Sequence, residues 1–364
     1  MLIDNSKQKE RQMKKTLWNI VGVAVAGTLL LSGCSTGGGT GGESGDSGRL
    51  VVGSFGGDYD SFLKSFVDPV FREAMPETEI LYSSGDTATL KTKLLAETSS
   101  DRGTFDVVQL SDKDMPAMKS AGALLKLDPS RIKNWDSIQP SLVDDYCVPH
   151  IHSAIGITYN PEKITEEITD WGQFLDPEVA SQAGQWERWS DYVFYGAAVD
   201  AADGDPGTDL SPGYNAAIEA AKLMRPYGTS TQIKSGMISG EISALVNTRA
   251  NAAQWSAESG QEFKSVVPDE GTREYVSFSC IPANSQNVDA AYEYLNAQLD
   301  PSAQQGFAEK MFYAPTVTNV ELDPKLEAAI SLTEEEASRI YTPDMAAITE
   351  AMPEMGRLWT EATR

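Results

Sequence analysis

The residues that could carry out catalysis in this chain are few and do not assemble into a known constellation. The two histidines, His150 and His152, stand two residues apart, and no cysteine or carboxylate cluster nearby completes a metal site or a Ser-His-Asp triad. Gly53, Gly56 and Gly57 lack the spacing of a dinucleotide-binding fingerprint, and no Gly-Lys-Ser follows them. We expect the histidines to be polar residues at a crossing between domains. No catalytic residue, metal, cofactor or enzymatic activity is predicted from these residues.

Aromatic residues at expected chain turns offer a different chemistry. Phe55 and Tyr59 flank the first pair of glycines, and others lie close to expected helices. Aromatic faces hold organic cations by cation–π attraction and hold sugars or aliphatic groups by stacking. Core packing is the commoner role of a single aromatic residue, but an aromatic residue at a strand end is a candidate for ligand contact. The candidates are Phe55, Tyr59, Trp186, Trp189, Tyr192, Trp255, Tyr275 and Tyr313.

The elements that would position these residues alternate between strand and helix. This alternation predicts an α/β fold with a mostly parallel sheet, in which ligands lie beyond the carboxyl ends of the strands. The first expected strands are 49–53, 79–82 and 105–110, and helices are expected at 87–98 and 115–121. The strand ends contain further candidates for ligand contact, namely Gly56, Gly57, Ser84, Gly85, Ser111 and Asp112.

The second half of the chain repeats this pattern without an internal sequence repeat. Strands are expected at 153–159, 242–247, 263–267 and 276–282, and helices at 191–199, 214–224, 288–299 and within 333–363. A chain of 364 residues is long enough for two globular lobes, each with its own core.

The composition excludes several classes of protein. With 29 basic and 53 acidic residues, the chain carries a formal net charge of −24, which argues against binding to nucleic acid. Three cysteines and two histidines are too few for a zinc or disulfide scaffold. Cys147 and Cys280 could form a disulfide or remain as two buried thiols, and the sequence does not decide between them.

The first residues are typical of a bacterial lipoprotein signal. Lys14 and Lys15 precede the apolar run 17–31, which is short for a transmembrane helix, and Ser32-Gly33-Cys34 follows. Cleavage after residue 33 would leave Cys34 as a lipidated N-terminus. Residues 34–48 are rich in glycine and serine and are interpreted as a flexible tether. We therefore expect an extracytoplasmic protein that a lipid anchors to the outer face of the cell membrane.

Eight short motifs follow one another between Phe55 and Asn287, and the similarity that they mark extends from about Leu50 to the C-terminus. In this order they resemble the extracellular solute-binding proteins of ABC importers, in the branch that includes the spermidine/putrescine-binding proteins. Each motif alone is weak, but eight in order are specific. They are Phe55-Gly56-Gly57-Asp58-Tyr59, Phe105-Asp106-Val107-Val108, the segment from Gly122 to Asp128, Gly156-Ile157-Thr158-Tyr159-Asn160, the segment from Asp170 to Pro177, Ser239-Gly240-Glu241, the segment from Val267 to Gly271, and the segment from Ile281 to Asn287.

The resemblance implies a two-lobed periplasmic-binding-protein fold of type II, with a mostly parallel sheet flanked by helices in each lobe and the ligand cleft between the lobes. The implied first lobe comprises 50–153 and 278–321, and the second comprises 154–277 and 322–364. The lobes would close over a small-molecule solute by a hinge motion, and the closed monomer would then deliver it to the permease subunits of the importer.

Departures from the family pattern bear on the solute. In the segment Glu270 to Ser277, the family's polyamine binders carry an Asp where this chain has Ser277, although the aromatic residue is retained as Tyr275. Two further positions that are acidic in those polyamine binders align with Trp189 and Tyr192 of this chain, and Asp191 lies beside them. Burying a dication without carboxylates is costly. We therefore expect a monocation or zwitterion held by aromatic faces and Asp191, or a small acid.

Two arginines could contribute to binding a solute carboxylate or phosphonate. Arg249 aligns with a position that is often polar or aromatic in the family's cleft, and Arg273 lies in the departing segment. The alternative, a solvated surface arginine on a very acidic protein, has equal weight for Arg249 and is favoured for Arg273. The alternative functions are a polyamine receptor and, less favoured, a ferric-ion receptor or a secreted hydrolase.

Overall fold

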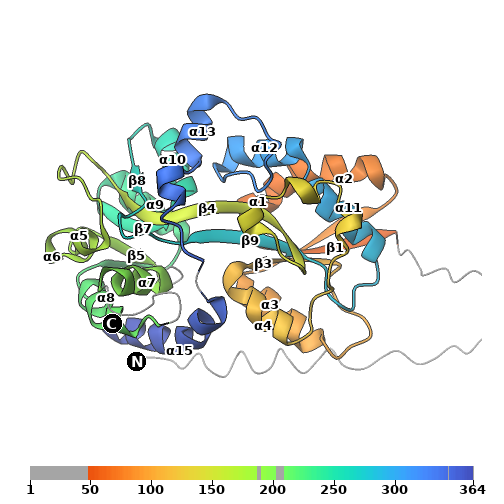
Figure 1. The fold of residues 1–364 in the computed structure, drawn as a ribbon, viewed down its shortest axis with the longest axis horizontal. Coiled ribbons are helices and arrows are strands. Elements are labelled where there is room, and N and C mark those ends of the chain that lie inside the picture. Colours follow the sequence, from red (N-terminus) through yellow and green to blue (C-terminus); the bar gives the residue numbers. More distant parts are fainter. Residues whose placement is uncertain (1–47, 187–189, 202–208, 343, 364) are drawn as a thin grey trace, which may run out of the picture. The chain divides into compact units, whose positions relative to one another are not determined.

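The computed structural model describes residues 48–186, 190–201, 209–342 and 344–363. The predicted signal, Cys34, the tether up to residue 47 and Trp189 lie outside these described residues. One seven-stranded sheet runs through the described chain in the order β2-β1-β3-β9-β4-β7, with β8 also paired to β4, and β5 and β6 form a small parallel pair (Figure 1). The strands are β1 (Arg49–Ser54), β2 (Glu79–Ser84), β3 (Val107–Ser111), β4 (Cys147–Tyr159), β5 (Gly184–Trp186), β6 (Arg225–Tyr227), β7 (Ala244–Thr248), β8 (Lys264–Val266) and β9 (Glu274–Cys280).

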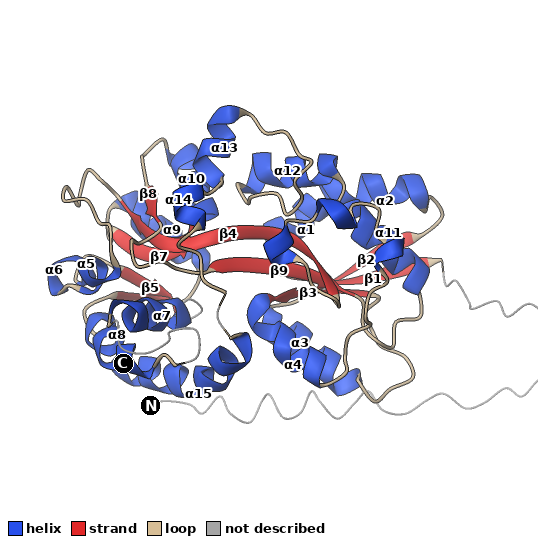
Figure 2. Cartoon of the chain, viewed as in Figure 1, coloured by secondary structure: helices blue, strands red, loops and turns tan. Residues whose placement is uncertain are grey.

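Helices lie on both sides of this sheet (Figure 2). Several begin where an Asp carboxylate accepts a backbone N–H, as Asp86 does from Thr89 and Asp170 does from Gln173. None of the helices described is long and apolar enough to cross a bilayer. The helices are α1 (Gly57–Phe62), α2 (Asp68–Ala74), α3 (Thr87–Glu97), α4 (Met115–Ser120), α5 (Trp171–Leu175), α6 (Pro177–Ala180), α7 (Ser190–Asp200), α8 (Tyr214–Ala221), α9 (Ser230–Ser239), α10 (Arg249–Ser259), α11 (Val288–Gln298), α12 (Pro301–Met311), α13 (Pro324–Ile330), α14 (Glu334–Ala337) and α15 (Met345–Ala362).

The sheet is mixed, whereas the sequence predicts mostly parallel strands. The parallel arrangement holds for β1, which pairs in parallel with β2 and β3, but β9, β4, β7 and β8 join the sheet antiparallel to their neighbours. The reason is that β4 and β9 carry the chain from one half of the sheet to the other and back, so they must run in opposite directions. We call the elements around β1–β3 the first lobe and those around β5–β8 the second lobe.

The long strand β4 belongs to both lobes. Its residues Cys147 to Ala154 pair with β9, and its residues from Ile155 onward pair with β7 and β8. A bulge interrupts the ladder with β9 between Pro149 and Ile151, so one extra residue, His150, is accommodated there.

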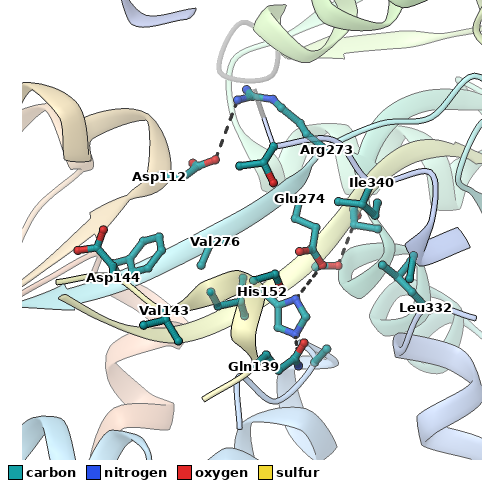
Figure 3. Close-up of a pocket in the computed structure, with 18 of the residues that line it drawn as sticks. Asp112, Gln139, Val143, Asp144, His152, Arg273, Glu274, Val276, Leu332 and Ile340 are labelled. Carbon is teal, nitrogen blue, oxygen red and sulfur yellow. Dashed lines mark hydrogen bonds and ion pairs between the residues drawn. The ribbon is translucent and has the colours of Figure 1, made fainter. Parts of the chain in front are cut away.

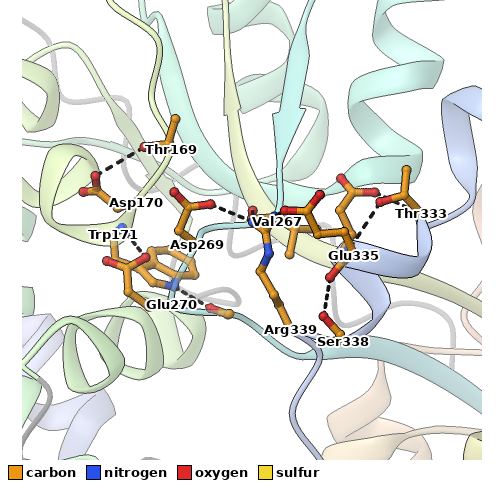
Figure 4. Close-up of polar contacts among 12 residues, drawn as sticks. Thr169, Asp170, Trp171, Val267, Asp269, Glu270, Thr333, Glu335, Ser338 and Arg339 are labelled. Carbon is orange, nitrogen blue, oxygen red and sulfur yellow. Dashed lines mark hydrogen bonds and ion pairs between the residues drawn. The ribbon is translucent and has the colours of Figure 1, made fainter.

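The C-terminal segment makes a further connection across the molecule. The backbone N–H of Thr272 donates to the carbonyl oxygen of Arg339 at 3.0 Å, and the N–H of Tyr341 donates back to Thr272 at 2.8 Å. The Arg339 side chain also reaches Asp269 and Glu335, at 2.7 and 2.6 Å (Figure 4). From here the chain enters α15, which packs on α7 and α8 of the second lobe and on α4 of the first.

A continuous apolar core extends through both lobes. It includes β3, whose five residues are all buried, and the fully buried Trp171, whose indole Nε1 donates to the carbonyl oxygen of Gly271 at 2.9 Å. A second, smaller cluster in the second lobe contains Trp255 and Phe263. Trp255 is therefore a core residue, and Trp186 packs, half-buried, against both clusters.

Cys147 and Cys280 form a disulfide, which settles the alternative that the sequence leaves open. They are directly opposite one another at the first-lobe end of the β4–β9 ladder. The bond joins residues 133 positions apart and so closes a long loop. In the chain-entropy model, a cross-link of this span stabilises the fold chiefly by restricting the unfolded chain.

We predict that replacing both residues, as in the double variant Cys147→Ala/Cys280→Ala, lowers the free energy of unfolding by about 2–4 kcal/mol. Chemical denaturation of the oxidised wild type, the reduced wild type and the double variant measures this loss. The reduced protein should resemble the variant. As a check, residues 49–364 can be unfolded without a reductant and their free thiols titrated. Two free thiols would show that the disulfide between Cys147 and Cys280 is absent.

Candidate functional site

The carboxyl ends of β1 and β2 meet at one edge of the sheet, because the two strands are parallel and in register. Asp60 in α1 joins them: its carboxylate accepts hydrogen bonds from the Ser54 and Ser84 hydroxyls and, at 3.1 Å, from the Gly56 N–H. Gly56 and Gly57 both have positive φ, 80° and 60°, a backbone conformation that favours glycine. The predicted candidates Phe55, Gly56, Gly57, Ser84 and Gly85 are therefore brought together at this edge.

Tyr59 points into the protein from the same region. It is 6% exposed, and its hydroxyl lies 2.6 Å from Nδ1 of His150 and 3.2 Å from Oε1 of Gln109. Burial lowers the pKa of His150 to about 3, so the imidazole is neutral at physiological pH. Burial also raises the pKa of Tyr59 well above its usual value, so the phenol keeps its proton and donates it within this network. The network fixes Tyr59 rather than activating it.

Four charged side chains from three separate segments meet between the lobes. Lys113 Nζ lies 2.9 Å from Oδ1 of Asp191, and Nη2 of Arg273 is ion-paired with Oδ2 of the same carboxylate. Nη1 of Arg273 lies 4.0 Å from Oδ2 of Asp112 (Figure 3). Asp112 and Lys113 follow β3, Asp191 is the second residue of α7, and Arg273 precedes β9. We refer to Asp112, Lys113, Asp191 and Arg273 as the charged cluster.

Tyr192 provides an aromatic face for this cluster. The guanidinium carbon of Arg273 lies 4.1 Å from the centre of its ring, and Lys113 Nζ lies 5.2 Å from it. The Tyr195 ring is 5.9 Å from the same guanidinium carbon. A carboxylate beside an aromatic face is the environment that favours an organic cation. In this structure the protein's own Arg273 lies there.

The charged cluster is balanced and almost fully buried. It contains two carboxylates and two cations, and the side chains of Arg273 and Asp191 are only 2% and 5% exposed. Burial raises the pKa of Asp112 to about 6, against the opposing effects of Arg273 and Lys113. The guanidinium of Arg273 keeps unused capacity, because its Nε has no hydrogen-bond partner among the described residues. Buried donors of this kind are usually satisfied, so this one is available to an acceptor.

The predicted residues of β9 lie on the same face of the strand as Arg273. Side chains alternate between the faces of a strand, so Arg273, Tyr275 and Ser277 share one face. Tyr275 is 7% exposed, and its ring centre lies 6.2 Å from that of Tyr313. Ser277 is fully buried. Ser111, at the end of the neighbouring β3, donates to Asp114 at 2.6 Å.

Arg249 lies apart from the charged cluster. It begins α10, where its guanidinium is ion-paired with Glu336 and Nη1 donates to the carbonyl oxygen of Ser331 at 2.7 Å. It lines a different cavity, of about 780 Å³, beside α13. The two arginines that the sequence suggested together are therefore separated.

Sequence reasoning missed Lys113, Asp60 and Tyr195. Lys113 follows a predicted candidate, Asp112, but nothing in its local sequence indicates a partner 78 positions away. Asp60 could not be singled out from the sequence, because the chain contains 53 acidic residues. No group of three or more His, Cys, Asp or Glu side chains in the described part of the chain is arranged to hold a metal ion.

Comparison with known proteins identifies the family. A family model described as "Bacterial extracellular solute-binding protein" matches residues 71–334. The putrescine-binding periplasmic protein SpuD of Pseudomonas aeruginosa is 25% identical over 303 residues, covering 75% of this chain and 81% of that protein. The spermidine/putrescine-binding periplasmic protein of Salmonella typhimurium is 26% identical over 280 residues, covering 74% of this chain and 76% of that protein.

Solved structures of this fold agree with the sequence comparison. An ABC transporter structure from Clostridium perfringens superposes with a TM-score of 0.70 at 21% identity, covering 86% of this chain and all of that one. A GABA receptor superposes with a TM-score of 0.72 at 19% identity, covering 87% of this chain and 98% of that one. These matches confirm the predicted periplasmic-binding-protein fold. The chain belongs to the bacterial extracellular solute-binding proteins, the non-enzymatic receptors of ABC importers.

Proposed function

We propose that this receptor captures a small zwitterion, with one ammonium and one carboxylate group, and delivers it to its permease. The observation that carries the proposal is the balanced charge of the buried cluster, in which each carboxylate already lies beside a cation. A solute with net charge would leave an uncompensated charge in this buried site, which is costly. A zwitterion adds one charge of each sign and keeps the balance.

The cluster also offers a matched place for each end of such a solute. The carboxylate would bind Arg273, whose Nε is unused by the described residues, and the ammonium would bind Asp191 against the face of Tyr192. The solute would thus take the place of the present pairing between Arg273 and Asp191. Tyr275, Tyr313 and Ser277 would complete the wall on the same face of β9.

The alternative is a polyamine, which the names of the curated relatives suggest. Against it, Ser277 replaces an expected carboxylate, and the two carboxylates of the charged cluster lie beside Lys113 and Arg273. A solved protein of the same fold carries the name of a GABA receptor, so the fold accommodates a zwitterion.

Closure and anchoring complete the proposal. The lobes would hinge at β4 and β9, with the lobe boundaries near 153–154, 277–278 and 321–322. Because the cluster joins residues that follow β3 to α7, it would form only when the lobes close. Cys34 would carry the lipid that holds the monomeric receptor at the membrane, and residues up to 48 would serve as its tether.

The first prediction concerns the charge of the solute. Calorimetric titration of residues 49–364 should show one-site, salt-insensitive binding for a member of a zwitterion panel that includes γ-aminobutyrate, betaine and alanine. Putrescine and spermidine should give weak heat that 0.3 M salt removes, because exposed charges are screened. Arg273→Gln should weaken zwitterion binding at least about tenfold, because a charge-assisted hydrogen bond is lost.

Arg339→Gln is the matched control, since Arg339 is also ion-paired but lies outside the charged cluster. It should leave the affinity unchanged. Tight, salt-insensitive spermidine binding would replace the zwitterion proposal with the polyamine alternative.

A second prediction concerns the cluster itself. Asp191→Asn leaves Lys113 and Arg273 without their shared carboxylate, so the free energy of unfolding should fall by about 3 kcal/mol. Asp269→Asn, which removes a carboxylate that is 67% exposed beside Arg339, should cost less than about 1 kcal/mol. Urea denaturation compares the two, and equal losses would show that the cluster has no special role.

A further inference from the structure

A groove of about 910 Å³ lies against the other face of the crossing strands (Figure 3). Glu274, Val276 and Phe278 line it, whereas Tyr275 and Ser277 alternate with them and point the opposite way. Asp112 and Arg273 border the groove, but Lys113 and Asp191 do not line it. The groove therefore adjoins the solute site at Asp112 and Arg273 but lies mostly outside it, and its volume is that of a small-molecule site.

The walls of the groove are apolar and come from distant parts of the chain. The first lobe contributes Leu142 and Val143, and the C-terminal segment contributes Ile340 and Tyr341. Val143 is 45% exposed and Tyr341 is 47% exposed, which places both among the four large apolar side chains that are exposed in the described chain. Apolar surface left uncovered in a concave site indicates a binding surface.

Of the carboxylates that line the groove, that of Glu274 lies beside a histidine and has one oxygen that remains unpaired among the described residues. Oε1 of Glu274 is 2.9 Å from Nδ1 of His152, whose Nε2 lies 3.1 Å from both Gln139 Nε2 and the carbonyl oxygen of Pro315. Oε2 of Glu274 makes no hydrogen bond with any residue that the structure describes. The side chain is 14% exposed, so this oxygen is an acceptor at the base of an apolar groove.

The charges around the groove favour a cation. Its two basic residues, Lys119 and Arg273, are each ion-paired, with Asp144 and Asp191. Five carboxylates line it, those of Asp112, Asp144, Glu274, Glu327 and Asp344. A cationic group can therefore bind without displacing a basic side chain, whereas an anion would face a surplus of carboxylates.

We propose that this groove is a second binding site, for an organic cation with an apolar body. The charged nitrogen lies at Glu274, and the hydrocarbon contacts the apolar walls that contain Val143 and Tyr341. The inference does not depend on which solute the site between the lobes receives. Because the walls belong to different parts of the molecule, an occupant bridges the first lobe and the C-terminal segment.

The test uses tetrabutylammonium as the probe and tetramethylammonium as its less apolar counterpart, titrated into the purified full chain at 0.15 M salt. Tetrabutylammonium should bind at one site, and tetramethylammonium at least about tenfold more weakly, because it buries far less apolar surface. Glu274→Gln should weaken tetrabutylammonium binding about tenfold, since the counter-charge is lost. Tyr341→Ser should weaken it several-fold.

Leu223→Ser is the matched control, because Leu223 is 45% exposed and does not line the groove. It should leave probe affinity unchanged. If Glu274→Gln perturbs folding, Tyr341→Ser still decides the matter, because its side chain is half exposed. Equal affinity for both cations, or equal effects of Tyr341→Ser and Leu223→Ser, would overturn the proposal.

Discussion

The antiparallel ladder between β4 and β9 is the interaction on which the two halves of the sheet and the candidate site depend. It runs from the Cys147–Cys280 pair in the first lobe to Ala154 and Glu274 at the edge of the second. The first lobe joins it through β3, and the second joins it through β7 and β8. The alternating side chains of one ladder thus present one face to the proposed solute site and the other to the groove lined by Glu274, Val276 and Phe278.

Under the proposed function, the buried ion pairs of the charged cluster serve recognition more than stability. Removing two carboxylates and two cations from water is costly, and hydrophobic side chains of similar size would often stabilise the fold better. Such a cluster would provide fixed charges in a site that is shielded from water. A solute whose charges match these groups would then bind more tightly than a solute that brings an unpaired charge. The aromatic face of Tyr192 adds attraction for a cation without adding a formal charge.

Much of this architecture is evident in the sequence, because strands such as β3 are continuous apolar runs and the helices that follow them have clear periodicity. The helix α10 was not expected, since its sequence, RANAAQWSAES, has no clear apolar stripe and depends on packing against β4 and α13. The strand ends were found because polar and glycine residues follow apolar runs. The partnership of Lys113, Asp191 and Arg273 could not be found, because it joins segments that only the tertiary fold brings together. Likewise, the separation of Arg249 from Arg273 follows from its pairing with Glu336.

The bulge at His150 restricts how many residues β4 can have between Cys147 and Ala154. In a regular strand the two histidines would share a face and a neighbourhood, yet His150 contacts Tyr59 whereas His152 pairs with Glu274. The disulfide fixes the ladder on one side of the bulge, and the pairing of Ala154 with Glu274 fixes it on the other. With both ends fixed, losing or gaining one residue between these points would remove or enlarge the bulge and redirect the side chains around it. Homologous receptors that keep this ladder should therefore tolerate substitutions at its individual positions more readily than insertions or deletions within it.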